Sequence, residues 1–413
     1  MSISSKLFGN KLNDYFISLD IGSEVVKALI VQLDRKNERA FIIGVGKRYQ
    51  KNENILIDVK DNFQNIVSVC AFAVDDAVKI AKIRPRKIII GMDGNFVKGV
   101  SIKINYKRKT NKDRIGEKEL KSIIAEVQRN LHENVRKIVQ KKEAFDSDIF
   151  ITHSSITNIN IDGYKVINPI GFKGSNIEFS IFNSFMLHSH YELIKNISKK
   201  LNAELLEIVS QLYAVSIAKG IKNISKSNII LVDIGRKTTS VAVLYKGIIE
   251  SVKSFNIGEK SFNHHSLSEF DLKATETENP EKRCNKGRMD ESSSDKINKA
   301  FENYEILLDG IELSLEDFAH INLASFKILF YGEGSGFSEN NRDVIIKLLS
   351  KRLFPFSKMK IDFIDYRDIL KIKDKTNEIK DFQYINSLSL ANFIFDKEVE
   401  EDQCNKILNN IIK

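Results

Sequence analysis

The chain has 413 residues, enough for two or three domains at roughly 150 residues each. Apolar residues make up 42% and charged residues 29%, which excludes an intrinsically disordered chain. The net charge of +9 comes from basic residues spread along the sequence, so we expect no nucleic-acid partner. No apolar run approaches the ~18 residues of a membrane-spanning helix. The three cysteines lie far apart, which excludes a disulfide framework and indicates a cytoplasmic protein.

Residues 14–83 predict the first part of an α/β domain. Apolar runs at 15–20 and 25–33 flank a short turn, and a third run follows at 41–46. This pattern indicates that the chain opens with an antiparallel meander of three strands. Residues 62–82 then carry apolar side chains at helical spacing, and Arg84-Pro85-Arg86 ends that predicted helix.

Residues 84–183 predict a β-α-β-β subdomain inserted into this domain. A strand is expected at 97–105, and 117–142 form the clearest helix in the chain, with one apolar stripe at steps of three and four residues. Over most of 148–185 apolar and polar residues alternate, which indicates antiparallel strands with one buried face. The first half of the host domain then resumes at 184–226.

The opening pattern recurs in the second half, which we place at 227–395. The segment ISLDIGSEVVKALIV at 17–31 is matched by ILVDIGRKTTSVAVL at 230–244, so strand, Asp-Ile-Gly turn and strand occur twice. Such a duplication predicts two similar halves. Residues 271–297 are polar and predict a linker or mobile loop. Further helices are expected at 298–319, 342–352 and 384–395.

Three glycine-containing turns carry the only candidate chemistry. A glycine in a tight turn lets the backbone approach a phosphate, with N–H groups directed at the anion. The carboxylates of Asp20 and Asp233 precede two of these turns and can hold Mg²⁺ through water or orient an attacking water. The third turn, Gly332-Glu333-Gly334-Ser335-Gly336, follows a predicted buried strand and suits contact with a flat adenine.

The order of these turns resembles the actin-like ATPase superfamily, with two phosphate loops and a later adenosine loop. The insert at 84–183 and the stretch Asn168-Pro169-Ile170-Gly171-Phe172-Lys173-Gly174 resemble the FtsA-type cell-division proteins. PilM of pilus assembly shares the insert and is the nearest relative of that family. The resemblance implies a two-lobed duplicated actin-like (ribonuclease H-like) α/β fold. It also implies a nucleotide site with bound ATP and Mg²⁺, formed by Asp20, Gly22, Ser23, Lys27, Asp233, Gly235, Arg236, Lys237, Thr238, Gly332, Gly334 and Ser335.

The resemblance further implies a function in cell division. An FtsA-type protein is a self-assembling adaptor that tethers the FtsZ ring at the septum to the cytoplasmic membrane. It lies in the cytoplasm, peripheral on the inner face of that membrane. ATP would serve as a structural ligand, with at most weak ATPase activity and no separate catalytic set.

Several departures from the family pattern surround the nucleotide. The second phosphate loop usually reads DIGGGT, but here Arg236 and Lys237 replace two glycines. Either this loop has another shape, or the two cations contact phosphate as charges, or nucleotide binding has been lost. Glu259 and Glu333 replace two further expected glycines, and the polar segment 271–297 stands where the family has a small helical subdomain.

Residues 396–413 predict an amphipathic carboxyl-terminal tail. Its aliphatic residues fall on one helical face and could bind a membrane surface weakly, helped by avidity in a filament. The acidic stretch from Glu398 to Asp402 opposes binding to anionic lipid. The alternative is a final helix that packs on the protein itself. The membrane-facing residues in the first interpretation are Ile407, Leu408, Ile411 and Ile412.

Two other functions remain open. A PilM-like adaptor of type IV pilus or secretion assembly would bind a short peptide of its partner and need no membrane tail. A sugar-kinase-like phosphotransferase of the same superfamily would need a carboxylate base in a substrate pocket and intact glycines in the second phosphate loop. The altered loop and the insert both argue against that enzyme.

Overall fold

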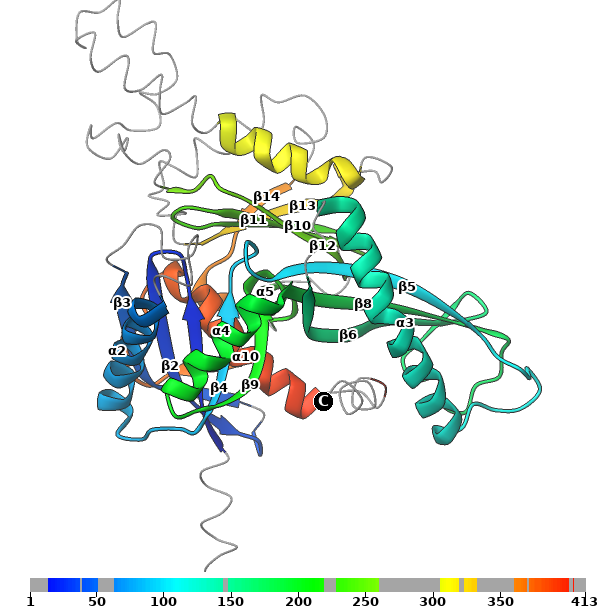
Figure 1. Cartoon of the computed structure of the whole chain (residues 1–413), viewed down its shortest axis with the longest axis horizontal. Helices are drawn as coiled ribbons and strands as arrows, with labels where there is room; N and C mark the ends of the chain where they lie inside the picture. The colour runs from blue at the N-terminus through cyan, green and yellow to red at the C-terminus, as the bar shows by residue number, and fades with distance from the viewer. Residues whose placement is uncertain are drawn as a thin grey trace, which may run out of the picture.

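A computed structural model describes residues 14–37, 39–50, 63–143, 148–218, 228–259, 305–318, 323–332, 360–369, 371–400 and 404. The chain folds into two lobes, each built on a mixed β-sheet, and an insert that extends sideways from them (Figure 1). Among the described residues no helix has the length and apolarity needed to cross a bilayer.

The first lobe contains a six-stranded sheet in the order β15-β3-β2-β1-β4-β9. The expected meander is present, because β1 and β2 pair antiparallel, as do β2 and β3. Strands β4 and β9 then extend the sheet in parallel with β1. Helices α2 and α4 pack on one face of it. These elements are β1 (Tyr15–Ile21), β2 (Val25–Asp34), β3 (Arg39–Tyr49), α2 (Phe63–Ala81), β4 (Lys87–Met92), α4 (His188–Lys200), β9 (Glu204–Ser210) and β15 (Ile372–Asp374).

The second lobe repeats this arrangement. Strands β10 and β11 form an antiparallel hairpin, and β13 pairs in parallel with β10, as β4 does with β1. A helix over 305–315 covers the outer face of this sheet. The structure therefore confirms the two similar halves expected from the repeated sequence. The strands are β10 (Ile229–Ile234), β11 (Thr239–Tyr245), β12 (Ile248–Phe255), β13 (Lys327–Tyr331) and β14 (Lys360–Phe363).

The insert adds four strands to the second lobe's sheet, which then has nine strands in the order β14-β13-β10-β11-β12-β5-β8-β6-β7. Its apolar face packs on α3, whose apolar stripe was expected at 117–142. The expected boundary at residue 84 takes in β4, but β4 pairs within the first lobe, and the inserted strands run from Lys98 to Leu187. The elements of the insert are the strands β5 (Lys98–Lys107), β6 (Ile149–Ile161), β7 (Tyr164–Val166) and β8 (Asn176–Leu187) and the helix α3 (Glu117–Glu143).

Two helices cross between the lobes. Helix α5 (Gln211–Ile217) leaves the first lobe and lies against β10, β11 and β12. Helix α10 (Ile385–Glu400) follows the second lobe's strands and lies against β1, β2 and β4 of the first lobe. The shared core between the lobes includes Tyr213 of α5, Leu390 of α10 and Phe182 of the insert.

Candidate functional site

Side-chain alternation along the first strand of each lobe directs one carboxylate into the space between the lobes. In β1, Ile17, Leu19 and Ile21 face α2 and α4, so Asp20 points to the opposite face, toward α10. In β10, Ile230, Val232 and Ile234 face the helix over 305–315, so Asp233 points inward as well. The period of the two strands therefore brings the two aspartates to the same interface.

The turn that follows each aspartate has the same backbone geometry. The Gly22 N–H donates to the carbonyl of Val25 at 3.1 Å, and the Gly235 N–H donates to the carbonyl of Thr238 at 2.8 Å. A Cβ at either glycine would lie under 3.0 Å from that carbonyl oxygen, at 2.8 Å in the first turn and 2.9 Å in the second. Both glycines are therefore required by close backbone approach, and the second turn keeps its shape despite its changed residues.

Asp20 is buried and lies among several donors. The Lys27 Nζ is 3.6 Å from its Oδ2, and the Ser387 hydroxyl donates to the same oxygen at 3.1 Å. Gln211, the first residue of α5, donates its side-chain amide to Oδ1. The predicted site residues Asp20 and Lys27 therefore lie together. The Asp20 carboxylate is therefore held by one side chain from each of the two crossing helices, Gln211 of α5 and Ser387 of α10.

Asp233 is held by the neighbouring residue of the same helix. The Asn386 amide donates to the Asp233 Oδ2 at 3.0 Å. Gly332, at the end of β13, has φ +114°, and a Cβ there would lie 2.2 Å from the Asp233 Oδ1. Consecutive residues at the start of α10, Asn386 and Ser387, thus contact the aspartates of both lobes. These two residues were not predicted as site residues, because no local pattern connects them with strands more than 150 positions away.

Arg236 forms the charged contact between the two turns. Its Nη1 lies 3.2 Å from the Glu24 Oε2 of the first turn, and its Nε lies 3.7 Å from the Glu259 Oε2. The Arg236 side chain has an exposed fraction of 36%, whereas both glutamate side chains are largely buried. The residue that replaces a glycine in the second turn therefore joins the lobes through an ion pair. Lys237 beside it is partly exposed.

Asp93 was not predicted as a site residue, although it follows β4 at the same end of the sheet as Asp20. The Thr238 hydroxyl donates to its Oδ2 at 3.3 Å, so the second turn also contacts the first lobe here. Burial raises the pKa of Asp93 to about 6, although hydrogen bonds from the Asn95 backbone N–H and the Thr238 hydroxyl lower it. The negative charge of Asp20 is a smaller raising contribution. The Asn95 amide donates to Asn256 at 2.8 Å and adds another contact between the lobes.

The remaining predicted residues divide into two groups. Ser23 lies in the first turn, and Gly332 lies against Asp233, so the first part of the third turn reaches the site. Gly334, Ser335 and the tail residues Ile407, Leu408, Ile411 and Ile412 lie outside the described residues. Within the part of the chain that the structure describes, no group of three or more His, Cys, Asp or Glu side chains is placed to hold a metal directly.

The class of fold follows from three features. These are two lobes of repeated topology, paired turns that meet between the lobes, and two helices that cross from one lobe to the other. This is the duplicated actin-like ATPase fold. The chain is 22% identical over 298 residues to the cell division protein FtsA of Bacillus subtilis (strain 168). That match covers 69% of this chain and 61% of the relative.

A solved structure, the PilM-PilN type IV pilus biogenesis complex, superimposes with a TM-score of 0.57 at 13% identity. The superposition covers 91% of this chain and 97% of that one. No family model matches the chain. The expected resemblance to FtsA-type actin-like proteins is therefore confirmed, and it rests on the fold and on a weak sequence similarity.

Proposed function

We propose that this protein is an FtsA-type assembly adaptor that links the FtsZ ring to the cytoplasmic face of the membrane during division. The observation that carries the proposal is an actin-like fold whose insert lies between β4 and α4, in a chain similar in sequence to FtsA. In this role the protein acts by contact: one surface binds the partner, copies of the chain bind one another, and the carboxyl-terminal tail contacts lipid.

A PilM-like adaptor of pilus or secretion assembly is the second candidate. It is favoured by the superposition on the PilM-PilN complex, which covers nearly the whole of both chains. The two candidates share a fold and differ in the partner peptide that they bind.

Peptide binding separates the two candidates. The full chain would be titrated with fluorescent peptides whose sequences come from the organism that encodes this protein. One peptide is the carboxyl terminus of FtsZ, and the others together span PilN, with a scrambled peptide as the control. Saturable micromolar binding of the FtsZ peptide alone is expected. Binding of PilN peptides alone would transfer the proposal to pilus assembly, and binding of neither by folded protein would refute both adaptors.

The fold implies a nucleotide, and the residues between the lobes fit one in part. Both glycine turns have the close backbone approach that a phosphate site needs, and Lys27 and Arg236 supply positive charge beside them. Glu24 and Glu259 oppose this, because they already engage the guanidinium of Arg236. We therefore propose that phosphate and the two glutamates compete for Arg236, and that Asp20 and Asp233 approach Mg²⁺ only through water. Bound Mg·ATP would supply negative charge between the turns and favour the closed, self-associating form.

Nucleotide affinity in two variants tests this competition. Glu24→Gln removes a competing charge and is expected to tighten binding of a fluorescent ATP analogue several-fold, whereas Arg236→Ala is expected to weaken it. Lys253→Ala removes an ion pair with Asp317, on the far side of β12, and is the matched control. Equal affinity in the wild type and both variants would show that Arg236 does not contact phosphate. Phosphate release should stay slow in every variant.

A further inference from the structure

The far end of the insert carries a loop pair that the adaptor role does not use. We call residues 107–118 and 162–174 the insert tip. Asp162 and Gly163 form the two-residue turn between β6 and β7, both with positive φ (46° and 88°), which is the geometry of a tight type I′ hairpin. Figure 1 places this tip at the end of the insert that lies farthest from the two lobes.

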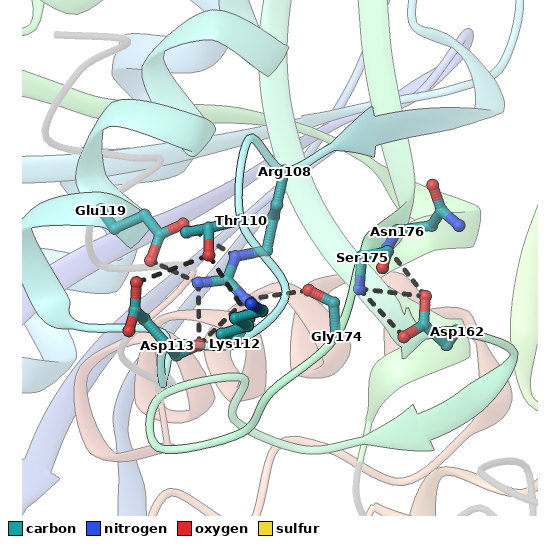
Figure 2. Close-up of polar contacts among 9 residues, drawn as sticks. All are labelled: Arg108, Thr110, Lys112, Asp113, Glu119, Asp162, Gly174, Ser175 and Asn176. Carbon is teal, nitrogen blue, oxygen red and sulfur yellow. Dashed lines mark hydrogen bonds and ion pairs between the residues drawn. The ribbon is translucent and has the colours of Figure 1, made fainter.

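A buried arginine holds the two loops of the tip together. Arg108 makes a bidentate pair with Glu119 at 2.7 and 2.8 Å and donates to the carbonyl of Gly174 at 2.8 Å (Figure 2). Its backbone N–H also donates to the carbonyl of Ser175 at 2.8 Å. A guanidinium with this many partners fixes both loops in one geometry, so the tip presents its outer side chains from a rigid base.

The apolar residues of the tip point in two directions. Val166 and Ile170 pack against the core of the insert and anchor the loop. Tyr164, Ile167 and Phe172 project outward, with exposed fractions of 79%, 85% and 50%. These are three of the eight large apolar side chains that are exposed among the described residues, and they fall within nine positions of one loop. Single exposed apolar residues are common, but such a group indicates a contact surface.

The tip that carries these three side chains is rich in basic residues. The tip contains eight basic residues and three acidic ones. Arg108 is neutralised by Glu119, and Asp162 accepts hydrogen bonds from the backbone N–H groups of Ser175 and Asn176, which lower its pKa. The exposed cations are Lys107, Lys109, Lys112, Arg114, Lys118, Lys165 and Lys173.

We propose that the insert tip is a binding site for an anionic lipid bilayer. Outward aromatic and aliphatic side chains at the end of a projecting subdomain can enter the interfacial region, while the lysines of the tip meet lipid phosphates. Charge complementarity favours an anionic surface, and the apolar group adds the second signal that stable peripheral binding needs. This contact is separate from the carboxyl-terminal tail and does not depend on whether the partner is FtsZ.

The absence of tryptophan from the chain provides a direct reporter. Phe172→Trp places a single tryptophan at the tip, and Leu313→Trp places one at a similarly exposed position on the helix over 305–315. With vesicles of 70:30 phosphatidylcholine and phosphatidylglycerol, the tip reporter is expected to shift its emission to the blue and to be quenched by brominated lipid, and the control reporter is not. Water-like emission from Phe172→Trp in vesicle-bound protein would overturn the proposal, because the tail alone would then account for binding.

Vesicle sedimentation of the full chain measures the energetic contribution. The experiment is run in the tail variant Leu408→Asp/Ile411→Asp, so that the tip is the surface tested. Tyr164→Ser/Ile167→Ser/Phe172→Ser is expected to weaken binding at least ten-fold. Lys165→Gln/Lys173→Gln is expected to weaken it by roughly five-fold per lysine at low salt. Ile306→Ser/Leu313→Ser, exposed apolar residues on the second lobe, is the matched control. Unchanged vesicle binding together with lost self-association in the tip variant would instead identify the tip as a contact between copies and would overturn the proposal.

Discussion

The first and second Asp-Ile-Gly turns share a backbone and differ in their side chains. In each, the glycine N–H reaches the carbonyl three residues later, and each aspartate is contacted by the start of α10. The first turn continues with Ser23 and Glu24, and the second continues with Arg236 and Lys237. Because Arg236 pairs with Glu24 of the opposite turn, the difference between the two turns is what joins them. Repetition thus preserved the geometry, while substitution in one copy produced a contact that two identical copies could not make.

The largest expected effect is at Gly332, which follows β13 and lies against Asp233, the aspartate that precedes the second turn. At Gly332→Ala the added Cβ would meet the Asp233 Oδ1 at 2.2 Å and the Ile234 carbonyl oxygen at 2.6 Å, at a φ that disfavours alanine. We expect a loss of about 2–4 kcal/mol in the free energy of unfolding, measured with urea. Gly116→Ala, where an added Cβ has no neighbour within 4 Å, is the control and should change stability by no more than about 1 kcal/mol.

The buried carboxylate of Asp93, which accepts a hydrogen bond from the second turn, makes stability depend on pH. The pKa of Asp93 is about 6 in the folded protein, above the ordinary value of 3.8 for an aspartate, so the folded state binds this proton more tightly than the unfolded state does. Its protonation therefore stabilises the protein fully below pH 3.8, and this contribution is lost as the pH rises through 6. Asp93→Asn should remove about 2–3 kcal/mol of pH dependence across this window, measured by urea unfolding at several pH values. A pH-independent difference between the two proteins would contradict it.

The third prediction tests the helix that contacts both turns. Asn386→Ala removes a donor to Asp233, and because the carboxylate is largely buried we expect a loss of about 1–2 kcal/mol. Asn386→Asp should destabilise the protein more at neutral pH, because it places a second carboxylate beside Asp233. If Asn386→Asp were as stable as the wild type, the contact would not exist in solution.

The smallest effect is expected for the ion pair between the turns. The side chain of Arg236 is about one-third exposed, so Arg236→Ala should lower stability by less than about 1 kcal/mol at low salt. The difference should shrink further near 1 M salt, where screening is strong. A salt-independent loss would indicate that the side chain contributes by packing and not by charge.

The repeated strands and turns could be predicted from sequence because their signals are local. Apolar runs ending in Asp-Ile-Gly specify strand, turn and strand, and the regular stripe at 117–142 specifies a helix. The burial of Asp20 and Asp233 between the lobes also follows from alternation along each strand, once both sheets are placed.

The contacts that complete the site could not be predicted, because they join distant segments. Ser387 and Asp20 are 367 positions apart, and Asn386 and Asp233 are 153 apart. Neither Asn386 nor Ser387 has a sequence context that marks a buried ligand of a carboxylate. Cys404 is a further example: it lies within the predicted tail 396–413 and is buried in the core of the insert, and no local pattern marked this contact. For Cys404 alone, this placement agrees with the alternative of a final segment that packs on the protein.

The pairing of β5 with β12 has a mechanical consequence. Strand β5 departs from the first lobe just beyond Asp93, yet Gly99 and Val100 join the ladder of the second lobe opposite Val252 and Ser251. The chain that leaves the first lobe is thereby hydrogen-bonded into the sheet of the second lobe. A rotation of one lobe relative to the other would strain the two residue pairs that form this ladder. The insert extends outward from this ladder, so a small rotation at the ladder would displace the far end of the insert by a larger distance.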